Sequence, residues 1–193
     1  MARKGLSKEK IIEAATQFIE EKGIKEFSVR ELAARLGIKA ASLYNYIENI
    51  DELSREVGLK AIAELTMQQQ QAVSGKERSE ALLALALAYR SFARERPQLY
   101  KVVMNLPEME ERRLLDTANE IITPLMKVLE LYDVSDEDRM HYQRILRSIM
   151  HGFADLQAVG YFAHFPVDND ESYHLAINNV AEKLEKLEAA AKK

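Results

Sequence analysis

The sequence predicts an all-α protein of about nine helices, and three observations support that prediction. Glycine and proline together make up 11 of 193 residues, about 6%, against roughly 12% in an average protein. Turns depend on these two residues for their backbone angles, so few turns and long helices are expected. Apolar residues recur at helical spacing through most of the chain, and no segment alternates as a strand does.

Composition excludes several classes of site. The chain has no cysteine, which rules out disulfides, zinc ribbons, cysteine-ligated iron–sulfur clusters and thiol nucleophiles. Its four histidines never form HExxH or another tight ligand pair, so neither a metal nor another cofactor is expected. No apolar run approaches ~18 residues and no apolar stretch follows the first residues, which predicts a cytoplasmic protein.

Charge is divided unevenly along the chain. The net charge is −4, which at first argues against a nucleic-acid partner. Residues 1–50, however, hold nine Lys or Arg against seven Asp or Glu, and residues 51–193 hold 18 against 24. A weakly basic head on an acidic body is compatible with DNA binding by the head.

The first two helices have clear boundary signals. Ser7 is a suitable N-cap for the first helix, and Gly23 can end it in a left-handed conformation. Ser28 and Glu31 have the spacing of a capping box, in which the serine oxygen accepts the Glu31 amide at the start of the second helix. Gly37 ends the second helix after roughly two turns, and its positive φ suits a tight turn.

A third helix is expected over about Ala40 to Tyr46, directly after that turn, with Leu43 and Ile47 in the core. The second and third helices then form a candidate helix-turn-helix, whose exposed third helix fits the DNA major groove. An ordinary helical hairpin is the alternative that this pattern leaves open. Asn49 caps a fourth helix that continues toward Gln71.

The rest of the chain predicts further helices around a buried central one. They are expected over about Glu80–Arg94, Pro97–Met104, Glu108–Tyr132 with a kink at Pro124, Asp136–Phe162, and from Asn169 or Asp170 onward. We therefore expect a DNA-binding domain over residues 1–53 and a ligand-binding and dimerisation domain over residues 54–193.

Two sets of motifs resemble a known family. The first is Phe27-Ser28-Val29-Arg30-Glu31-Leu32-Ala33, Leu36-Gly37-Ile38 and Ser42-Leu43-Tyr44-Asn45-Tyr46-Ile47, which resembles the N-terminal DNA-binding domain of TetR-family transcriptional regulators over residues 7–55. The second is Phe92-Ala93, Pro97, Leu99-Tyr100 and Met150-His151-Gly152-Phe153, which is similar to the ligand-binding half of the subgroup named for a Trp-His-Gly motif. Met150 stands where that subgroup has its tryptophan.

The resemblance implies DNA contacts for a set of polar and small residues. They are Arg3, Lys4, Ser28, Arg30, Lys39, Ala40, Ala41, Ser42, Tyr44, Asn45, Tyr46 and Asn49. Asn45 can pair with an adenine edge, whereas the alanines can only touch a thymine methyl group. Arg3 and Lys4, with Lys8, would form a short basic arm along the DNA. Solubilising charge is the alternative for the arm, and a half-buried core position is the alternative for Tyr44.

The resemblance also implies a ligand pocket and a dimer interface in the body. The candidate pocket residues are Tyr89, Phe92, Met104, Met126, Met150, His151 and Phe162. The candidate interface residues, on the last two helices, are Ser148, Gly152, Asp155, Val159, Ile177, Val180, Ala181 and Leu184. Plain core packing is the alternative for each set. A buried His151 would need a hydrogen-bond partner, which a ligand could supply.

These expectations combine into a ligand-responsive repressor that binds a palindromic DNA operator as a homodimer. A small, largely apolar molecule is the expected inducer, and no membrane partner is expected. An enzyme would need a clustered acid–base or metal constellation, and no such spacing is visible. The alternative is an architectural DNA-binding protein without an inducer pocket, for which a more basic chain would be expected.

Overall fold

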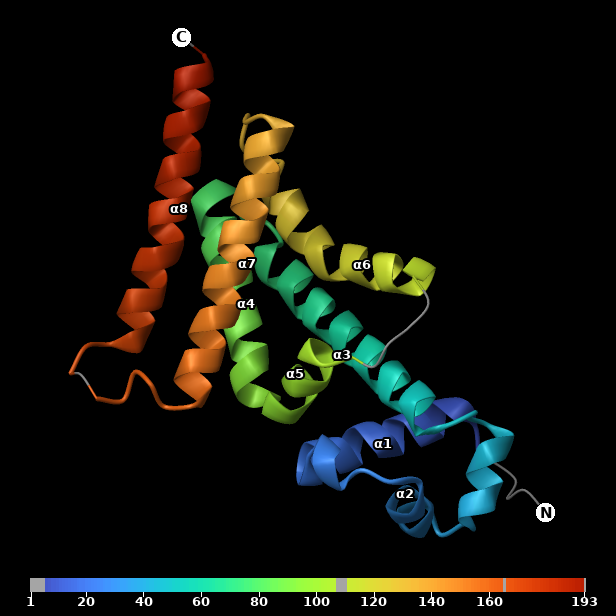
Figure 1. Cartoon of the computed structure of the whole chain (residues 1–193). Helices are drawn as coiled ribbons and strands as arrows, with labels where there is room; N and C mark the ends of the chain where they lie inside the picture. The colour runs from blue at the N-terminus through green and yellow to red at the C-terminus, as the bar shows by residue number, and fades with distance from the viewer. Residues whose placement is uncertain (1–5, 107–110, 165, 193) are drawn as a thin grey trace. The chain divides into compact units, whose positions relative to one another are not determined.

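The computed structural model describes residues 6–106, 111–164 and 166–192, and these residues form an all-α structure (Figure 1). Eight α-helices, two 3-10 helices and no strand occur within those ranges, which confirms the predicted fold class. The elements are α1 (Lys8–Lys22), η1 (Ile24–Glu26), α2 (Val29–Leu36), η2 (Ala40–Asn45), α3 (Ile50–Val73), α4 (Arg78–Glu95), α5 (Pro97–Met104), α6 (Glu111–Leu129), α7 (Asp136–Ala158) and α8 (Asn169–Ala191). None of the described helices combines the length and apolarity needed to cross a membrane.

The chain divides into two compact units, and each unit is made of two separate stretches of the sequence. The first unit runs to Glu64 and also includes Glu95–Leu114; the second comprises Leu65–Arg94 and Leu115–Lys193. This division differs from the expected boundary after residue 53. Much of α3 and all of α5 lie with the N-terminal helices. α5 packs on α1, and ion pairs join α3 to α1.

The predicted caps of the first two helices are present. Ser7 Oγ accepts a hydrogen bond from the Lys10 amide, and Ser28 Oγ accepts one from the Glu31 amide at 3.2 Å. Gly37 ends its helix in the left-handed conformation, with φ 64° and ψ 36°. Gly23 differs from the prediction, because its φ of 84° is positive but its ψ of 159° is extended, a conformation that also favours glycine.

The third predicted helix is a 3-10 helix rather than an α-helix. Within η2 and at its ends, amides bond to carbonyls three residues earlier: Ser42 to Lys39 at 2.9 Å and Tyr46 to Leu43 at 2.8 Å. Lys39 provides no side-chain cap for it. A six-residue segment held between a turn and α3 can close with these tighter bonds without completing α-helical turns.

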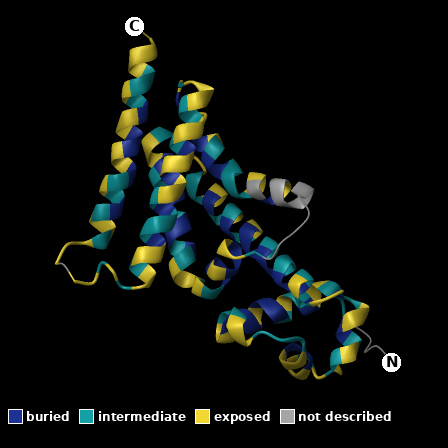
Figure 2. Ribbon diagram, in the orientation of Figure 1, coloured by how far each residue is buried: buried dark blue, intermediate teal, exposed yellow. Residues whose placement is uncertain are grey.

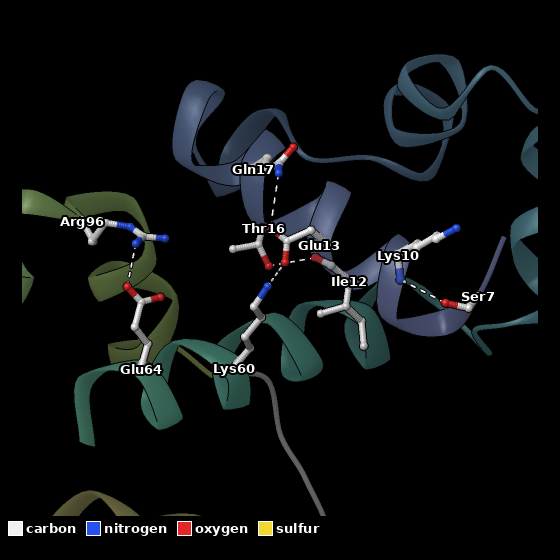
Figure 3. A network of polar contacts seen from close by, with 9 residues as sticks. All are labelled: Ser7, Lys10, Ile12, Glu13, Thr16, Gln17, Lys60, Glu64 and Arg96. Atoms are coloured by element: carbon white, nitrogen blue, oxygen red, sulfur yellow. Dashed lines mark hydrogen bonds and ion pairs between the residues drawn. The ribbon is translucent and has the colours of Figure 1, made fainter. Parts of the chain in front are cut away.

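Ion pairs join α5 and α3 to α1 in the first unit. Arg96, the residue before α5, donates from Nε to Glu20 of α1 and from Nη1 to Glu64 of α3 at 2.6 Å. Lys60 of α3 pairs with Glu13 of α1, and Figure 3 shows Arg96–Glu64 and Lys60–Glu13 side by side along α3. These contacts fasten α5 to the same unit as the helix-turn-helix candidate.

The second unit is built on the buried faces of α4, α7 and α8, whose opposite faces are exposed (Figure 2). α6 runs through Pro124 without a break and bends along its length in Figure 1.

α7 ends at Ala158, earlier than the predicted Phe162. Gly160, with φ 81°, receives the chain there, and the Tyr161 amide bonds to the Leu156 carbonyl at 3.0 Å. This hydrogen bond and glycine are the signature of a Schellman motif, which ends a helix.

Candidate nucleic-acid interface

α2 and η2 form a helix-turn-helix whose inner side is apolar and whose outer side is exposed. Leu43 and Ile47 are buried, as predicted, and hold η2 and the following segment against the unit. Tyr44, between them in sequence, has 56% of its surface exposed. The alternative of a half-buried core position for Tyr44 is therefore wrong. The exposed side of η2 therefore has the accessibility that a helix needs to enter the major groove of DNA.

The other predicted DNA contacts lie on or beside this exposed side. Arg30, Lys39, Ala41, Asn45 and Asn49 are exposed, and Ser28, Ala40, Ser42 and Tyr46 are half-buried. Arg3 and Lys4 lie outside the described residues. α2 and η2 pack on each other, and the start of α3 belongs to the same unit.

The start of α3 already has an internal anion. Glu52 Oε2 accepts the Glu48 amide at 2.6 Å, and Asn49 Oδ1 accepts the Glu52 amide at 2.8 Å. Lys8 Nζ donates to the same carboxyl group of Glu52 at 2.7 Å. The hydrogen bond from Lys8, and then that from the Glu48 amide, hold the pKa of Glu52 below its ordinary value. The Glu48 and Glu52 amides therefore already have acceptors within the chain.

Lys8 does not belong to a free basic arm, contrary to our expectation. It is the first residue of α1 and pairs with both Glu52 and Glu56 of α3. The hydrogen bond to Glu52 raises the pKa of Lys8 above its ordinary value, against the opposing effect of desolvation. Lys8 therefore ties α1 to α3, a role that only the tertiary contact reveals.

The candidate pocket residues are not equally placed. Tyr89, Phe92 and Met150 are buried in the second unit, and Met126 and Phe162 are half-buried there. Phe162 packs on Phe153, with ring centroids 4.8 Å apart. Met104 is exposed and belongs to the first unit.

His151 does not have the buried environment that we considered for it. Its side chain is 43% exposed, and Nε2 lies 3.3 Å from Asp155 Oδ2 one helical turn away. The chain itself provides this partner, so the histidine needs no ligand to satisfy it.

The candidate dimer residues divide between outer and inner positions. On α7, Ser148, Asp155 and Val159 are exposed and Gly152 is half-buried. On α8, the four predicted residues are buried within the chain itself: Ile177, Val180, Ala181 and Leu184. The α8 stripe therefore packs within its own chain, and its part in a dimer interface stays a prediction. An apolar stripe at helical spacing faces whichever surface is apolar, and here that surface is the core of its own unit.

Two arginines that join helices within the units were not predicted from the sequence. Arg96 links α5 to α1 and α3, as described above. Arg90 of α4 is buried, and it donates to Gln157 of α7 and Asp170 of α8. A signal was present for Arg90, because it interrupts the otherwise apolar run of α4 and a buried charge needs partners.

Two family models match the chain. One, described as bacterial regulatory proteins of the tetR family, matches residues 11–57, which contain the helix-turn-helix. The other, described as a tetracyclin repressor-like C-terminal domain, matches residues 82–180, about half of the chain. Neither description names the Trp-His-Gly subgroup, so that assignment stays a prediction.

Relatives and solved structures agree with these matches. Two relatives are each 29% identical to this chain: the uncharacterised HTH-type transcriptional regulators Rv0681 of Mycobacterium tuberculosis and YobS of Bacillus subtilis. These alignments cover 80% of this chain and 72% of Rv0681, and 81% of this chain and 81% of YobS.

Among solved structures, TetR from Acinetobacter baumannii matches with a TM-score of 0.68 at 16% identity, over 95% of this chain and 99% of that one. PfmR, a TetR family transcriptional regulator from Thermus thermophilus, matches with a TM-score of 0.64 at 20% identity, over 92% and 96%. At such identities these structures support the fold alone. From its family models and its helix-turn-helix, the chain belongs to the TetR family of DNA-binding transcriptional regulators.

Proposed function

We propose that this protein is a ligand-responsive repressor that acts in the cytoplasm. It binds a palindromic operator as a homodimer and is released when a small, largely apolar ligand binds. The observation that carries the proposal is the division of η2, in which Leu43 is buried while Tyr44 and Asn45 are exposed. A recognition helix must be held from behind and open in front, because only its outer side chains can reach base edges.

DNA contacts divide into those that position the protein and those that read bases. Lys39 and Arg30 are exposed cations suited to phosphate, and the Tyr44 hydroxyl can donate to a phosphate oxygen. Asn45 and Ser42 are the polar side chains of η2 that can reach base edges. The half-buried Tyr46 supports the helix while its hydroxyl remains a candidate phosphate donor.

Homodimer formation is supported by the outer face of α7. Ile145, Leu156 and Val159 are exposed apolar residues on this face, and Ser148 and Gly152 lie between them. A Cβ on Gly152 would meet no heavy atom within 4 Å. Glycine inside a helix costs about 1 kcal/mol relative to alanine, and nothing in its own chain requires it here. A partner helix that approaches closely supplies a reason for both the glycine and the apolar neighbours.

Ligand response is supported by the buried aromatic and methionine side chains of the second unit, Tyr89, Phe92 and Met150. A structurally similar TetR variant from Acinetobacter baumannii has been solved in complex with minocycline, with a TM-score of 0.68 at 18% identity over 95% of this chain and 99% of that one. Within the first unit, Arg96 joins α5 to α1, so a displacement of α5 would act directly on the DNA-binding helices. A ligand shifts the operator equilibrium only if it binds the released conformation more tightly.

The test begins with the DNA upstream of the protein's own gene. Fluorescence anisotropy with the purified full chain should show specific binding that weakens as salt rises, with two chains per site. Asn45→Ala should reduce the preference at one base pair, while a control variant on the second unit, Lys186→Ala, should bind as the wild type does. Failure to bind any site at low salt, in the promoter fragment or in a random library, would contradict the proposal.

The proposed release of DNA by a small apolar ligand is tested separately. A library of apolar small molecules is screened for release of the labelled operator and for a rise in Tm of the free protein. Compounds that do both are expected, because a ligand selective for the released state stabilises it. A protein that binds DNA specifically and that no compound releases or stabilises would instead match the architectural alternative.

A further inference from the structure

The 3-10 geometry of η2 arranges its side chains in three rows. With three residues per turn, side chains at i and i+3 lie above one another. Leu43 is buried and Ala40 is half-buried, so this pair forms the inner row. Ala41 and Tyr44 are both exposed and form one outer row. An α-helix of this length would not align these pairs, because its residues three apart differ by about 60° around the axis.

The remaining pair, Ser42 and Asn45, forms the second outer row, with Ser42 half-buried and Asn45 exposed. One outer row is thus a methyl group and a phenol, and the other is a hydroxyl and an amide. Residues 40–47 contain no Arg, Lys, Asp, Glu or Gln. Direct reading of guanine uses Arg or Lys on O6 and N7, and reading of cytosine uses a carboxylate on N4, so neither is provided by η2.

The outer rows do match the edges of an A·T pair. An asparagine amide can donate to adenine N7 and accept from the N6 amino group at once, and an alanine methyl can contact the C5-methyl of thymine. Ala41 and Asn45 are four residues apart, about 8 Å along a 3-10 axis with its rise of roughly 2.0 Å. That separation spans roughly two base-pair steps of about 3.4 Å each.

We propose that η2 reads A·T base pairs, with Asn45 on an adenine and Ala41 on the methyl group of a thymine about two pairs away. The inference rests on the DNA-binding function proposed above and specifies which bases the half-site presents to η2. Lys39 precedes η2, and any contact that it makes to a guanine falls on a neighbouring pair. Because the protein contacts the thymine methyl group, it should bind its operator more tightly than the same sequence with uracil in place of thymine.

The first experiment removes single groups from the DNA. A binding site is selected from a random duplex library with the full-length protein, and each thymine of a half-site is then replaced by deoxyuridine, which lacks only the C5-methyl. One replacement in the half-site should weaken binding about fourfold, the value of one buried methyl group. Replacing one adenine by 7-deazaadenine should weaken it by roughly 2- to 13-fold, because N7 no longer accepts one of the two hydrogen bonds while the N6 amino group still donates the other. Deoxyuridine outside the half-sites is the control.

The second experiment pairs each DNA change with a protein change. On the site with thymine, Ala41→Gly should lower the affinity by the same factor as the deoxyuridine replacement does. On the site that already has deoxyuridine, Ala41→Gly should lower the affinity no further. Asn45→Ala should likewise become insensitive to 7-deazaadenine. Because glycine can loosen a short helix, Ala41→Ser is measured beside it: it retains the Cβ, and it should keep the sensitivity to deoxyuridine. Equal unfolding midpoints of the variants show that the first unit is intact.

The outcomes separate the two proposals. If no specific site is selected, the DNA-binding function itself falls, and this inference falls with it. If a specific site is selected but its central pairs are G·C, or if no deoxyuridine replacement changes the affinity, only the A·T readout is overturned. Additive losses in the Ala41 and Asn45 pairings would also overturn it, because residues that touch the altered groups must be coupled to them.

Discussion

Arg90 Nη2 donates to Asp170 Oδ1 at 2.6 Å, and the two side chains differ sharply in exposure: 6% for the arginine and 63% for the aspartate. The guanidinium also lies over the rings of Phe153 and Tyr173, 5.2 and 5.0 Å from their centroids. One buried cation of α4 thus holds both α7 and α8. Tyr173 strengthens the same junction, because its hydroxyl donates to the Ala86 carbonyl of α4 at 2.8 Å.

The difference in burial between Arg90 and Asp170 predicts that removing the aspartate destabilises the protein more than removing the arginine. Asp170→Ala leaves a buried guanidinium without its carboxylate and should lower the free energy of unfolding by about 2 kcal/mol. Arg90→Met removes the buried charge, leaves only an exposed aspartate, and should cost about 1 kcal/mol. Urea denaturation of the full chain measures both, with Lys186→Met, an exposed position on α8, as control. An Arg90→Met variant less stable than Asp170→Ala would contradict this account.

Glu188 predicts a loss of stability in acid. The hydrogen bond from Arg78, and then that from Lys192, lowers its pKa from 4.5 to about 2. Since the folded pKa lies below the unfolded one, the stabilisation is fully present above about pH 4.5 and is lost as the pH falls toward 2. Glu188→Gln should therefore be less stable than the wild type at neutral pH and approach it at pH 2 to 3. Urea midpoints across this range test the prediction, and a difference that does not change with pH would refute it.

Gly58 of α3 packs directly against Leu106. A Cβ there would lie 2.1 Å from Leu106 Cδ2 and 3.4 Å from Val102 Cγ1. Gly58→Ala gains about 1 kcal/mol of helix propensity but must push the leucine aside, a cost of about 1–3 kcal/mol. In a Leu106→Ala background the clash is gone, so adding Gly58→Ala should raise the free energy of unfolding by about 1 kcal/mol. The double-mutant cycle by urea denaturation decides, and purely additive effects would show that the two residues do not touch.

Gly152 provides a separate test of the dimer. A Cβ at Gly152 meets no heavy atom of its own chain within 4 Å, so the isolated fold of Gly152→Gln should be as stable as the wild type or more so. If a partner helix lies on this face, the side chain should weaken dimerisation at least about tenfold by overpacking. Sedimentation velocity over a range of concentrations measures it. Arg147→Gln is the control: it is exposed on α7 but points about 140° away, and it should dimerise normally. Unchanged association of Gly152→Gln would remove α7 from the interface.

Lys39 should contribute to affinity without contributing to selectivity. Lys39→Ala should weaken binding to operator and to unrelated DNA by similar factors, and it should reduce the slope of log K against log salt by about one. Anisotropy titrations at several salt concentrations give the slope. A loss confined to the operator would instead mean that this lysine reads a base.

Local signals in the sequence were sufficient where the controlling contact is itself local. Ser28 and Gly37 determine the ends of α2 through bonds within four residues, and Leu43 and Ile47 are identified as core by spacing alone. The family could be recognised for the same reason, since the motifs of its DNA-binding domain lie in one continuous segment.

The remaining features depend on which surfaces meet, and spacing does not encode that. The stripe of α8 containing Ile177 and Leu184 would suit a partner chain or the core of its own unit, and only packing shows that it is buried in its own. Lys8 reads as a mobile basic residue until Glu52, 44 residues away, is placed beside it. By itself, then, the sequence determined the helical class, the helix-turn-helix and the family. The tertiary structure decided the assignment of α5 to the first unit and the inward direction of α8, because each depends on contacts between residues distant in the chain. It also showed the 3-10 form of η2, which the helical spacing of the sequence does not distinguish from an α-helix.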